Sequence, residues 1–237
     1  MPFESVEIPT AMPVLSPDYD HASLFATAGA VIWLIDSQDE WITSIEELLR
    51  LAIFLTDKYP RVNLEVLVHK TDNLSEEFRN DTFRDIRQRT QDELADHGYG
   101  NRSISYYQTS IYDHSLFEAM SKVIQKLLIS LPAMESLLNN LCGLCRIKKA
   151  YLFDTVSRIY IATDASPTTL KDYVACFDYV DTLVDLKEIY GWRARFDSAG
   201  QLLPDAKGPK FETFVGESWL THDKTGDGYI FVKEINE

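Results

Sequence analysis

A polar motif that could recognise guanine lies in the first third of the chain. The motif reads His-Lys-Thr-Asp at residues 69–72, directly after an apolar run at 63–68. Guanine presents two adjacent hydrogen-bond donors, its ring N–H and its exocyclic amine. A single carboxylate can accept from both, so Asp72 is the candidate guanine-binding residue, and the aliphatic part of Lys70 could lie along the base. Alternatively, Lys and Asp after a strand are simply the polar start of a loop.

A second motif, Thr-Ser-Ile at residues 109–111, follows the next expected strand. In open parallel α/β sheets the ligand crevice lies outside the carboxyl ends of the strands. Two such motifs, separated by one amphipathic helix, therefore favour a single site for a guanine base. Backbone N–H groups around Ser110 and Ile111 could donate to the guanine carbonyl oxygen. No G-x-x-x-x-G-K-[ST] loop, which would hold phosphates, occurs in the sequence.

Alternating strands and helices are expected to position these two motifs. Apolar runs predict the buried strands, and apolar residues at helical spacing predict the helices. The spacing of Ser37 and Glu40 predicts a capping box for the first helix, and Phe78 is expected on the buried face of the second. The expected elements are strands at 30–36, 63–68 and 103–108 and helices at 41–60, from about 75 to 98, and at 113–132. This alternation predicts a parallel α/β sheet.

The pattern changes after residue 132. Two strands with a tight connection predict a hairpin, and a hairpin pairs antiparallel, which indicates a second, α+β domain. The expected elements here are a linker helix at 133–146, strands at 150–154 and 158–162, a helix at 168–190, and strands at 211–220 and 229–235. We therefore divide the chain into domains at 1–132 and 147–237, joined by the linker helix.

Composition narrows the class of protein. The net charge of −14 would repel DNA or RNA, so we expect no nucleic-acid partner. No apolar run approaches the roughly 20 residues that cross a bilayer, so we expect a cytoplasmic protein that reaches a membrane only through partners. Three cysteines form no disulfide framework, and the pair Cys142 and Cys145, with no second pair beside it, is expected to be two buried helical thiols.

A stretch near the C-terminus has the spacing of a calcium-binding loop. Its candidate ligands are Asp223, Thr225, Asp227 and Glu234. The alternative is a hairpin turn built on Thr-Gly-Asp-Gly that leads into the last strand. No helix can follow the loop and no paired second loop is present, so we favour the hairpin.

Several segments together resemble the Rag GTPases, specifically the C/D-type subunit. The segments that carry the resemblance are 29–39, 65–75, 91–94, 109–115 and 149–164. The resemblance implies an incomplete small-GTPase-like parallel sheet at 1–132, followed by a roadblock/longin-like dimerisation domain. It also assigns roles to the two motifs. His69, Lys70 and Asp72 match the base-reading motif, with His where most small GTPases have Asn, and Ser110 and Ile111 match the second base-contacting motif.

The resemblance further implies a function. Members bind GTP or GDP, with Mg²⁺ expected in the full-length protein, and pair with an A/B-type Rag subunit through the roadblock domain. A scaffold complex holds such heterodimers on the vacuolar or lysosomal membrane, where they signal amino-acid sufficiency to the target-of-rapamycin kinase complex. The chain is therefore expected to be a GTP-binding regulatory subunit.

The chain departs from the family pattern at its phosphate site. It lacks the phosphate loop and the first strands, and Thr10 stands where the family has a Gly that approaches the terminal phosphate. We therefore expect no hydrolytic activity from this chain as written. Compared with the family pattern, we also expect the C-terminal domain to be without a final strand and helix. The alternative function is a nucleotide-free scaffold that dimerises through the roadblock domain. The strand at 30–36 is expected to present an unpaired edge that favours aggregation.

Overall fold

The computed structural model describes residues 4–8, 14–16, 20–190, 217–221 and 229–233. The chain divides into two compact units, Met1–Leu131 and Pro132–Glu237. Each unit has its own secondary structure, and each is described by itself. No single helix among the described residues is long and apolar enough to cross a membrane.

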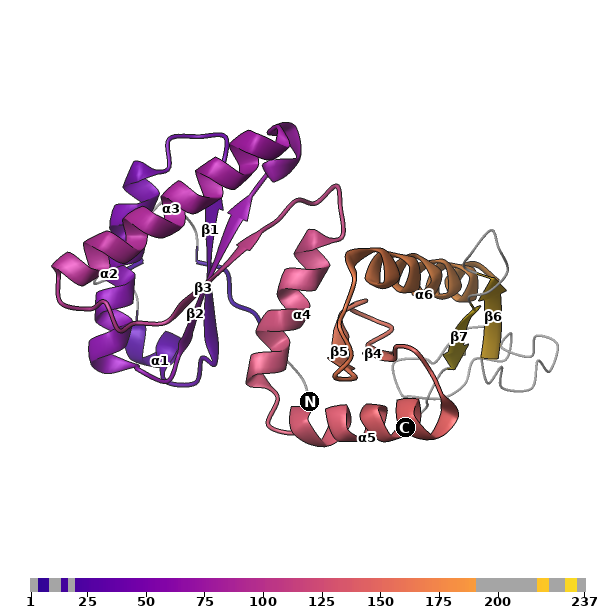
Figure 1. The fold of residues 1–237 in the computed structure, drawn as a ribbon. Coiled ribbons are helices and arrows are strands. Elements are labelled where there is room, and N and C mark those ends of the chain that lie inside the picture. The colour runs from indigo at the N-terminus through magenta and orange to yellow at the C-terminus, as the bar shows by residue number, and fades with distance from the viewer. Residues whose placement is uncertain (1–3, 9–13, 17–19, 191–216, 222–228, 234–237) are drawn as a thin grey trace, which may run out of the picture. The chain divides into compact units, whose positions relative to one another are not determined.

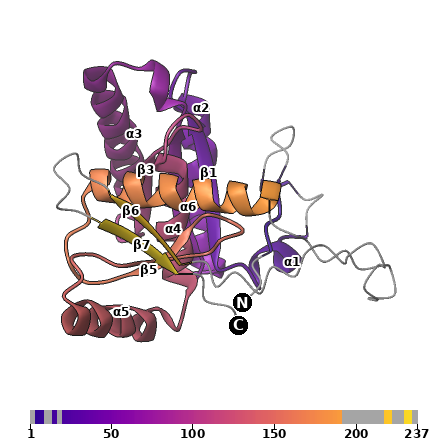
Figure 2. The ribbon, with the colours of Figure 1, turned by 90° about the vertical axis from the view of Figure 1, so that its right-hand side faces the viewer.

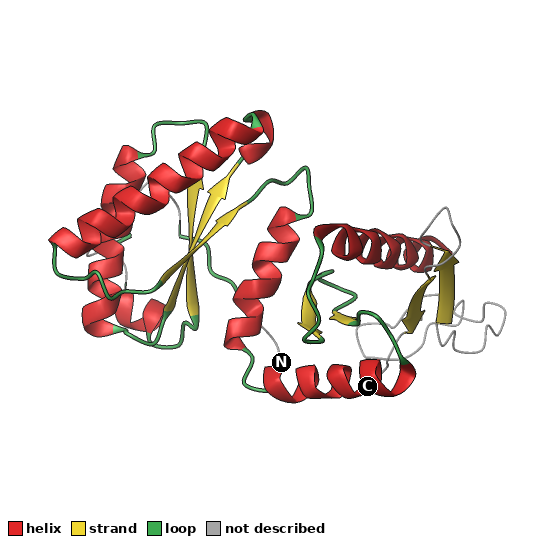
Figure 3. Cartoon of the chain, viewed as in Figure 1, coloured by secondary structure: helices red, strands yellow, loops and turns green. Residues whose placement is uncertain are grey.

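The first unit alternates strands and helices, as predicted (Figure 1 and Figure 3). Its elements are α1 (His21–Phe25), β1 (Ala30–Asp36), α2 (Ile42–Lys58), β2 (Asn63–His69), the 3₁₀ turn η1 (Thr71–Asn73), α3 (Glu76–Asp96), β3 (Ile104–Gln108) and α4 (Ser115–Leu127). The strands form one sheet in the order β1-β2-β3, and both pairings are parallel. The predicted parallel α/β sheet is confirmed, and among the described residues β1 and β3 are its edges.

The central strand β2 is buried on both faces. Five consecutive residues, Leu64 to Val68, are each at most 2% exposed. Leu64, Val66 and Val68 join a core cluster with the buried residues of α2 and α3, which cover one face of the sheet. Helix α4 covers the other face, beside β3 (Figure 1). Burial from both sides explains why β2 reads as a continuous apolar run rather than an alternating one.

Glu65 interrupts this apolar run and faces α4. Its carboxylate accepts hydrogen bonds from Lys126 Nζ at 2.9 Å and 2.8 Å and from the Tyr107 hydroxyl at 3.0 Å. Lys126 Nζ also donates to Ser105 Oγ at 2.6 Å and to the Tyr107 hydroxyl at 3.0 Å. Burial disfavours the charged ammonium, but the hydrogen bonds to Glu65 and Tyr107 outweigh it and raise the pKa of Lys126. The buried carboxylate is thus paired and hydrogen-bonded rather than isolated.

The ends of the helices depend on local capping. Ser75 Oγ accepts the N–H of Phe78 at 3.4 Å at the start of α3, and Gly98, at φ +84°, follows its C-terminal end. Two local predictions are wrong. Phe78 is 68% exposed because it lies in the first turn of α3, beyond the part that covers the sheet. The capping box of Ser37 and Glu40 is absent because α2 starts later, with Trp41 at its N-cap and no side-chain cap.

The second unit contains two antiparallel hairpins. Its elements are α5 (Leu131–Cys145), β4 (Tyr151–Phe153), β5 (Tyr160–Thr163), α6 (Leu170–Tyr190), β6 (Glu217–Thr221) and β7 (Tyr229–Lys233). Strands β4 and β5 pair antiparallel, as do β6 and β7. Figure 2 shows α6 as one long helix beside the first hairpin. Aromatic contacts join α6 to the first hairpin, with the rings of Tyr160 and Tyr173 centred 5.4 Å apart.

A buried ion pair closes the loop after β5. Lys149 Nζ lies 3.3 Å from Asp164 Oδ1, and the two side chains are 9% and 4% exposed. Burial alone would raise the pKa of Asp164, but hydrogen bonds from the backbone of Ala150 and from Ser166, together with the Lys149 charge, lower it to about 2. The carboxylate therefore ties the start of β4 to the end of β5.

Candidate functional site

The two motifs meet at the carboxyl edge of the sheet. Asp36, the last residue of β1, lies opposite His69, the last residue of β2. The N–H of Thr109 donates to the Val68 carbonyl at 2.9 Å, so the β3 end is bonded to the β2 end. Parallel strands bring all three ends to one edge, and the predicted site residues lie there.

Lys70 turns the chain sharply as it leaves β2. Its backbone has a φ of +60°, in the left-handed region that a residue with a Cβ rarely adopts. Two contacts to the β1 end hold it: Lys70 Nζ donates to Asp36 Oδ2 at 2.5 Å, and Gln38 Nε2 donates to the Lys70 carbonyl at 2.7 Å. The hydrogen bond from Lys70 lowers the pKa of Asp36, and the same bond raises the pKa of Lys70. Asp36 therefore positions the lysine that is predicted to lie along the base.

Thr71 anchors the turn that follows. It is 3% exposed, and both its N–H and its hydroxyl donate to the Thr109 carbonyl, at 3.4 Å and 3.3 Å. Arg79 Nε, from the first turns of α3, donates to the Thr71 carbonyl at 3.1 Å. These bonds fix the first motif directly against the second, so the next residue, Asp72, faces Ser110.

Asp72 and Ser110 form the centre of the site. The Ser110 hydroxyl donates to Asp72 Oδ1 at 2.6 Å, and Ser110 is fully buried. Ser110 Oγ in turn accepts the N–H of Tyr112 at 3.0 Å, so the serine is held from both sides. No described residue donates to Asp72 Oδ2. The carboxylate is therefore oriented by one oxygen and keeps acceptor capacity on the other, which is what two adjacent donors of a guanine base require.

The second motif can offer one backbone donor rather than two. The Ser110 N–H already donates to Ser115 Oγ at 2.9 Å. Asp113 accepts from both the hydroxyl and the N–H of Ser115, the latter at 2.9 Å, which fixes that acceptor. No described residue accepts from the N–H of Ile111, whose side chain is 65% exposed. Of the two backbone N–H groups predicted to donate to the guanine carbonyl oxygen, only that of Ile111 is therefore available.

His69 faces the neighbouring strand end. Its Nδ1 lies 2.9 Å from Thr109 Oγ1, so the imidazole links the ends of β2 and β3. This contact supports the loop that carries Lys70 and Asp72. Sequence reasoning missed Asp36, Ser115 and Arg79, because their roles depend on which strand ends become neighbours.

Other candidate sites are less well formed. The described residues contain no group of three or more His, Cys, Asp or Glu side chains that could hold a metal ion. The calcium-loop candidates Asp223, Thr225, Asp227 and Glu234 lie outside the described residues, as does Thr10. Cys142 and Cys145 are free thiols at the end of α5; Cys142 is half-buried and Cys145 is exposed, so the expectation of two buried thiols is wrong.

The family model that matches this chain and the known proteins that resemble it belong to the same family. The model of the Gtr1/RagA G protein conserved region matches residues 1–182. GTP-binding protein gtr2 of Schizosaccharomyces pombe is 46% identical over 235 residues, 99% of this chain and 72% of that protein. Ras-related GTP-binding protein C of Homo sapiens is 45% identical over 192 residues, 80% of this chain and 47% of that protein. GTP-binding protein GTR2 of Saccharomyces cerevisiae is 42% identical over 185 residues, 78% of this chain and 54% of that protein. The chain thus spans about half the length of the last two relatives.

Proposed function

The chain belongs to the Gtr1/RagA family of G proteins as a C/D-type Rag subunit, and we propose that its first unit reads the guanine base of GTP or GDP. Asp72 accepts from the ring N–H and the amine of the base, and the Ile111 N–H donates to its carbonyl oxygen. The side chain of Lys70, held by Asp36, lies along the ring. The observation that carries this proposal is the 2.6 Å bond from Ser110 to Asp72, because it orients a carboxylate with a free second oxygen.

The partners follow from the family. The chain pairs with an A/B-type Rag subunit through residues 147–237, which form a roadblock-like domain. A scaffold complex holds the heterodimer on the vacuolar or lysosomal membrane, where it signals amino-acid sufficiency to the target-of-rapamycin kinase complex. The antiparallel hairpin β4–β5 and the long helix α6 support a separate α+β domain in this region. Mg²⁺ accompanies the nucleotide phosphates in the full-length protein.

A second candidate function is a scaffold of the same family that binds no nucleotide and acts by dimerisation alone. It rests on the absence of a phosphate-binding loop from these 237 residues. Without backbone N–H groups around the phosphates, most of the usual binding energy for a nucleotide is missing.

Calorimetric titration with nucleoside diphosphates distinguishes the two functions. We expect GDP to bind this chain at least about ten-fold more tightly than ADP, because adenine cannot give two donors to Asp72. Asp72→Asn should weaken GDP by about 10- to 100-fold, the value of a hydrogen bond to a charged group, and should favour xanthosine diphosphate, which has an acceptor where guanine has the amine. The matched control is Asp85→Asn, an exposed carboxylate of α3 away from the site.

Two outcomes contradict the guanine proposal. Equal binding of GDP and ADP would show that the base is not read, and unchanged GDP binding by Asp72→Asn would show that another residue reads it. Absence of all nucleotide binding, with a stable complex formed on co-expression with an A/B-type Rag subunit, would establish the scaffold function instead.

A further inference from the structure

The outer edge of β3 presents unpaired backbone groups. Both backbone groups of Thr109 are directed to the β2 side: its N–H donates to Val68 and its carbonyl accepts from Thr71. Backbone direction alternates along a strand, so Tyr106 and Gln108 direct their N–H and carbonyl groups away from β2. Within the described part of the chain, none of these four groups has a hydrogen-bond partner. Such an edge is a template for a further strand.

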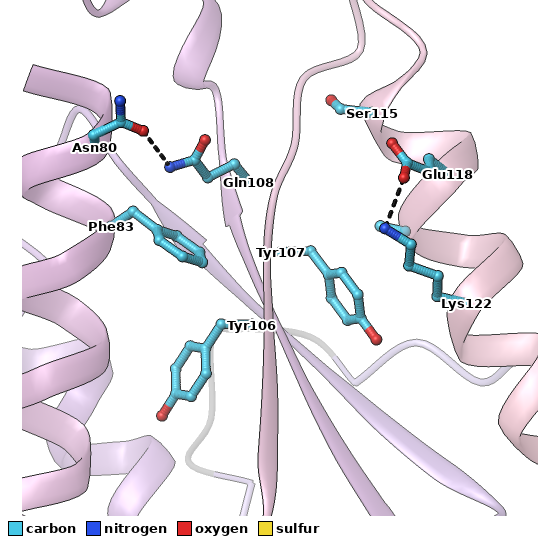
Figure 4. A pocket seen from close by; sticks show the side chains of 9 residues that line it. Asn80, Phe83, Tyr106, Tyr107, Gln108, Ser115, Glu118 and Lys122 are labelled. Atoms are coloured by element: carbon cyan, nitrogen blue, oxygen red, sulfur yellow. Dashed lines mark hydrogen bonds and ion pairs between the residues drawn. The ribbon is translucent and has the colours of Figure 1, made fainter. Parts of the chain in front are cut away.

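A groove of about 380 Å³ runs along this edge, between α3 and α4 (Figure 4). Its lining residues are Asn80, Phe83, Tyr106, Tyr107, Gln108, Ser115, Glu118, Ala119 and Lys122. The rings of Phe83 and Tyr106 lie on the α3 side, and the ring of Tyr107 lies on the α4 side. The groove therefore offers an apolar wall on each side of the strand edge, and it lies wholly within the first unit.

The two helices supply different charges to the groove. On α4, Lys122 Nζ is paired with Glu118 at 2.6 Å, so this side is neutral. On α3, Arg87 lies one turn after Phe83, is exposed, and makes no ion pair with any described residue. Its charge acts on Tyr106, where it opposes the rise in pKa that burial causes. Arg87 therefore gives the α3 side of the groove a local positive charge, which favours a carboxylate in the bound segment although the net charge of the chain is −14.

We propose that the outer edge of β3 binds an extended acidic segment of a partner protein, which adds to the sheet as a fourth strand. The segment pairs its backbone with Tyr106 and Gln108, places an apolar side chain against Phe83 and Tyr106, and sets a carboxylate beside Arg87. Because β3 has five residues and a strand advances about 3.3 Å per residue, a segment of about five residues spans the edge.

Binding can be measured on the full chain with a defined probe. The probe is a fluorescein-labelled, acetylated peptide of sequence Thr-Val-Asp-Phe-Asp-Val-Thr, and fluorescence anisotropy reports its affinity. Two control peptides share its length: one carries N-methyl groups on alternate backbone nitrogens, and the other has Asn in place of both Asp residues. We expect the first control to bind at least about ten-fold more weakly, because it cannot pair with the edge, and the second about three-fold more weakly, because it offers Arg87 no carboxylate.

Protein variants and amide exchange locate the contact. Gln108→Pro removes one outward N–H, and no β2–β3 bond, and should weaken the probe about ten-fold, whereas Gln108→Ala keeps the N–H and should change affinity less than about three-fold. The amides of Tyr106 and Gln108 should exchange more slowly when the probe is bound. The Tyr107 amide faces β2 and should not change, which makes it an internal control.

Several results would overturn the proposal. These are equal binding of the N-methylated peptide, no binding of the probe at about 1 mM, or unchanged exchange at Tyr106 and Gln108. If Gln108→Pro fails to fold, the peptide controls and the exchange measurement on the unmodified chain still test whether the segment pairs with the β3 edge. Concentration-dependent dimerisation that protects the same two amides without peptide would assign the edge to a second copy and would equally refute it.

Discussion

Replacing Lys126 by Met tests how the buried carboxylate of β2 is stabilised. Lys126 Nζ provides both charged hydrogen bonds to Glu65, at 2.9 Å and 2.8 Å, and Glu65 is 2% exposed. Met keeps most of the aliphatic side chain, so packing against the sheet changes little. The variant therefore isolates the loss of the positive charge.

The expected cost is large because an unpaired charge is left in the core. Removing one partner of a buried ion pair costs about 3–5 kcal/mol, and the Tyr107 hydroxyl, 3.0 Å from the carboxylate, compensates part of that. We therefore expect Lys126→Met to lower the free energy of unfolding by about 3 kcal/mol. The double variant Glu65→Leu/Lys126→Met removes both charges and should lie within about 1 kcal/mol of the unmodified chain.

Hydrogen exchange of β2 peptides in the full chain, measured against urea concentration, reports this free energy for the first unit alone. Lys122→Met is the matched control, since Lys122 lies one turn earlier on α4 and forms only an exposed pair with Glu118. It should cost less than about 1 kcal/mol. A loss below about 1 kcal/mol for Lys126→Met, or a double variant no more stable than the single one, would refute the reasoning.

Three further predictions follow from the contacts described. Ser110→Ala removes the hydroxyl that orients Asp72 and should weaken GDP about ten-fold by calorimetry, with an unchanged helix signal in circular dichroism. The pKa of Asp164 is about 2, below its ordinary value of 3.8, so the ionised carboxylate adds about 2 kcal/mol to the free energy of unfolding. This contribution is complete above about pH 4 and is lost as the pH falls toward 2. Asp164→Asn should not show this loss when its unfolding is followed in an acid titration. Leu34→Lys, at a 61% exposed position of edge strand β1, should raise the soluble fraction of chain expressed alone, measured by centrifugation, and an unchanged fraction would contradict an aggregation-prone edge.

Much of the fold of the first unit follows from local patterns. The apolar runs at 30–36 and 63–68 are strands within one residue. Burial on both faces explains the continuous apolar signature of β2 only, because Leu34 of β1 is 61% exposed. Gly98 marks the end of α3 because a left-handed residue there favours glycine. Local patterns failed at Ser37, whose N–H donates to the His69 carbonyl at 2.9 Å and so extends the strand contacts instead of capping a helix.

The candidate site was only partly predictable. Asp72 and Ser110 could be found because each belongs to a polar motif just after a strand, and their mutual bond follows from the order of β2 and β3. The occupation of the Ser110 N–H by Ser115 could not be foreseen, since it depends on how the loop before α4 folds back. The contact of Lys70 with Asp36 likewise needs β1 beside β2, which a linear pattern does not specify.

The charged residue within β2 also constrains how the strand aligns with its neighbours during folding. A run such as Leu-Glu-Val-Leu-Val would pair almost as well after a slip of one position if all its side chains were apolar. A slip turns Glu65 from the α4 face to the face that packs on α2, where Leu48 and Ala52 are fully buried and offer no hydrogen-bond donor. The misaligned sheet would carry a buried carboxylate without its lysine. Glu65 therefore makes one alignment of the central strand much lower in energy than the next, which an entirely apolar strand could not do.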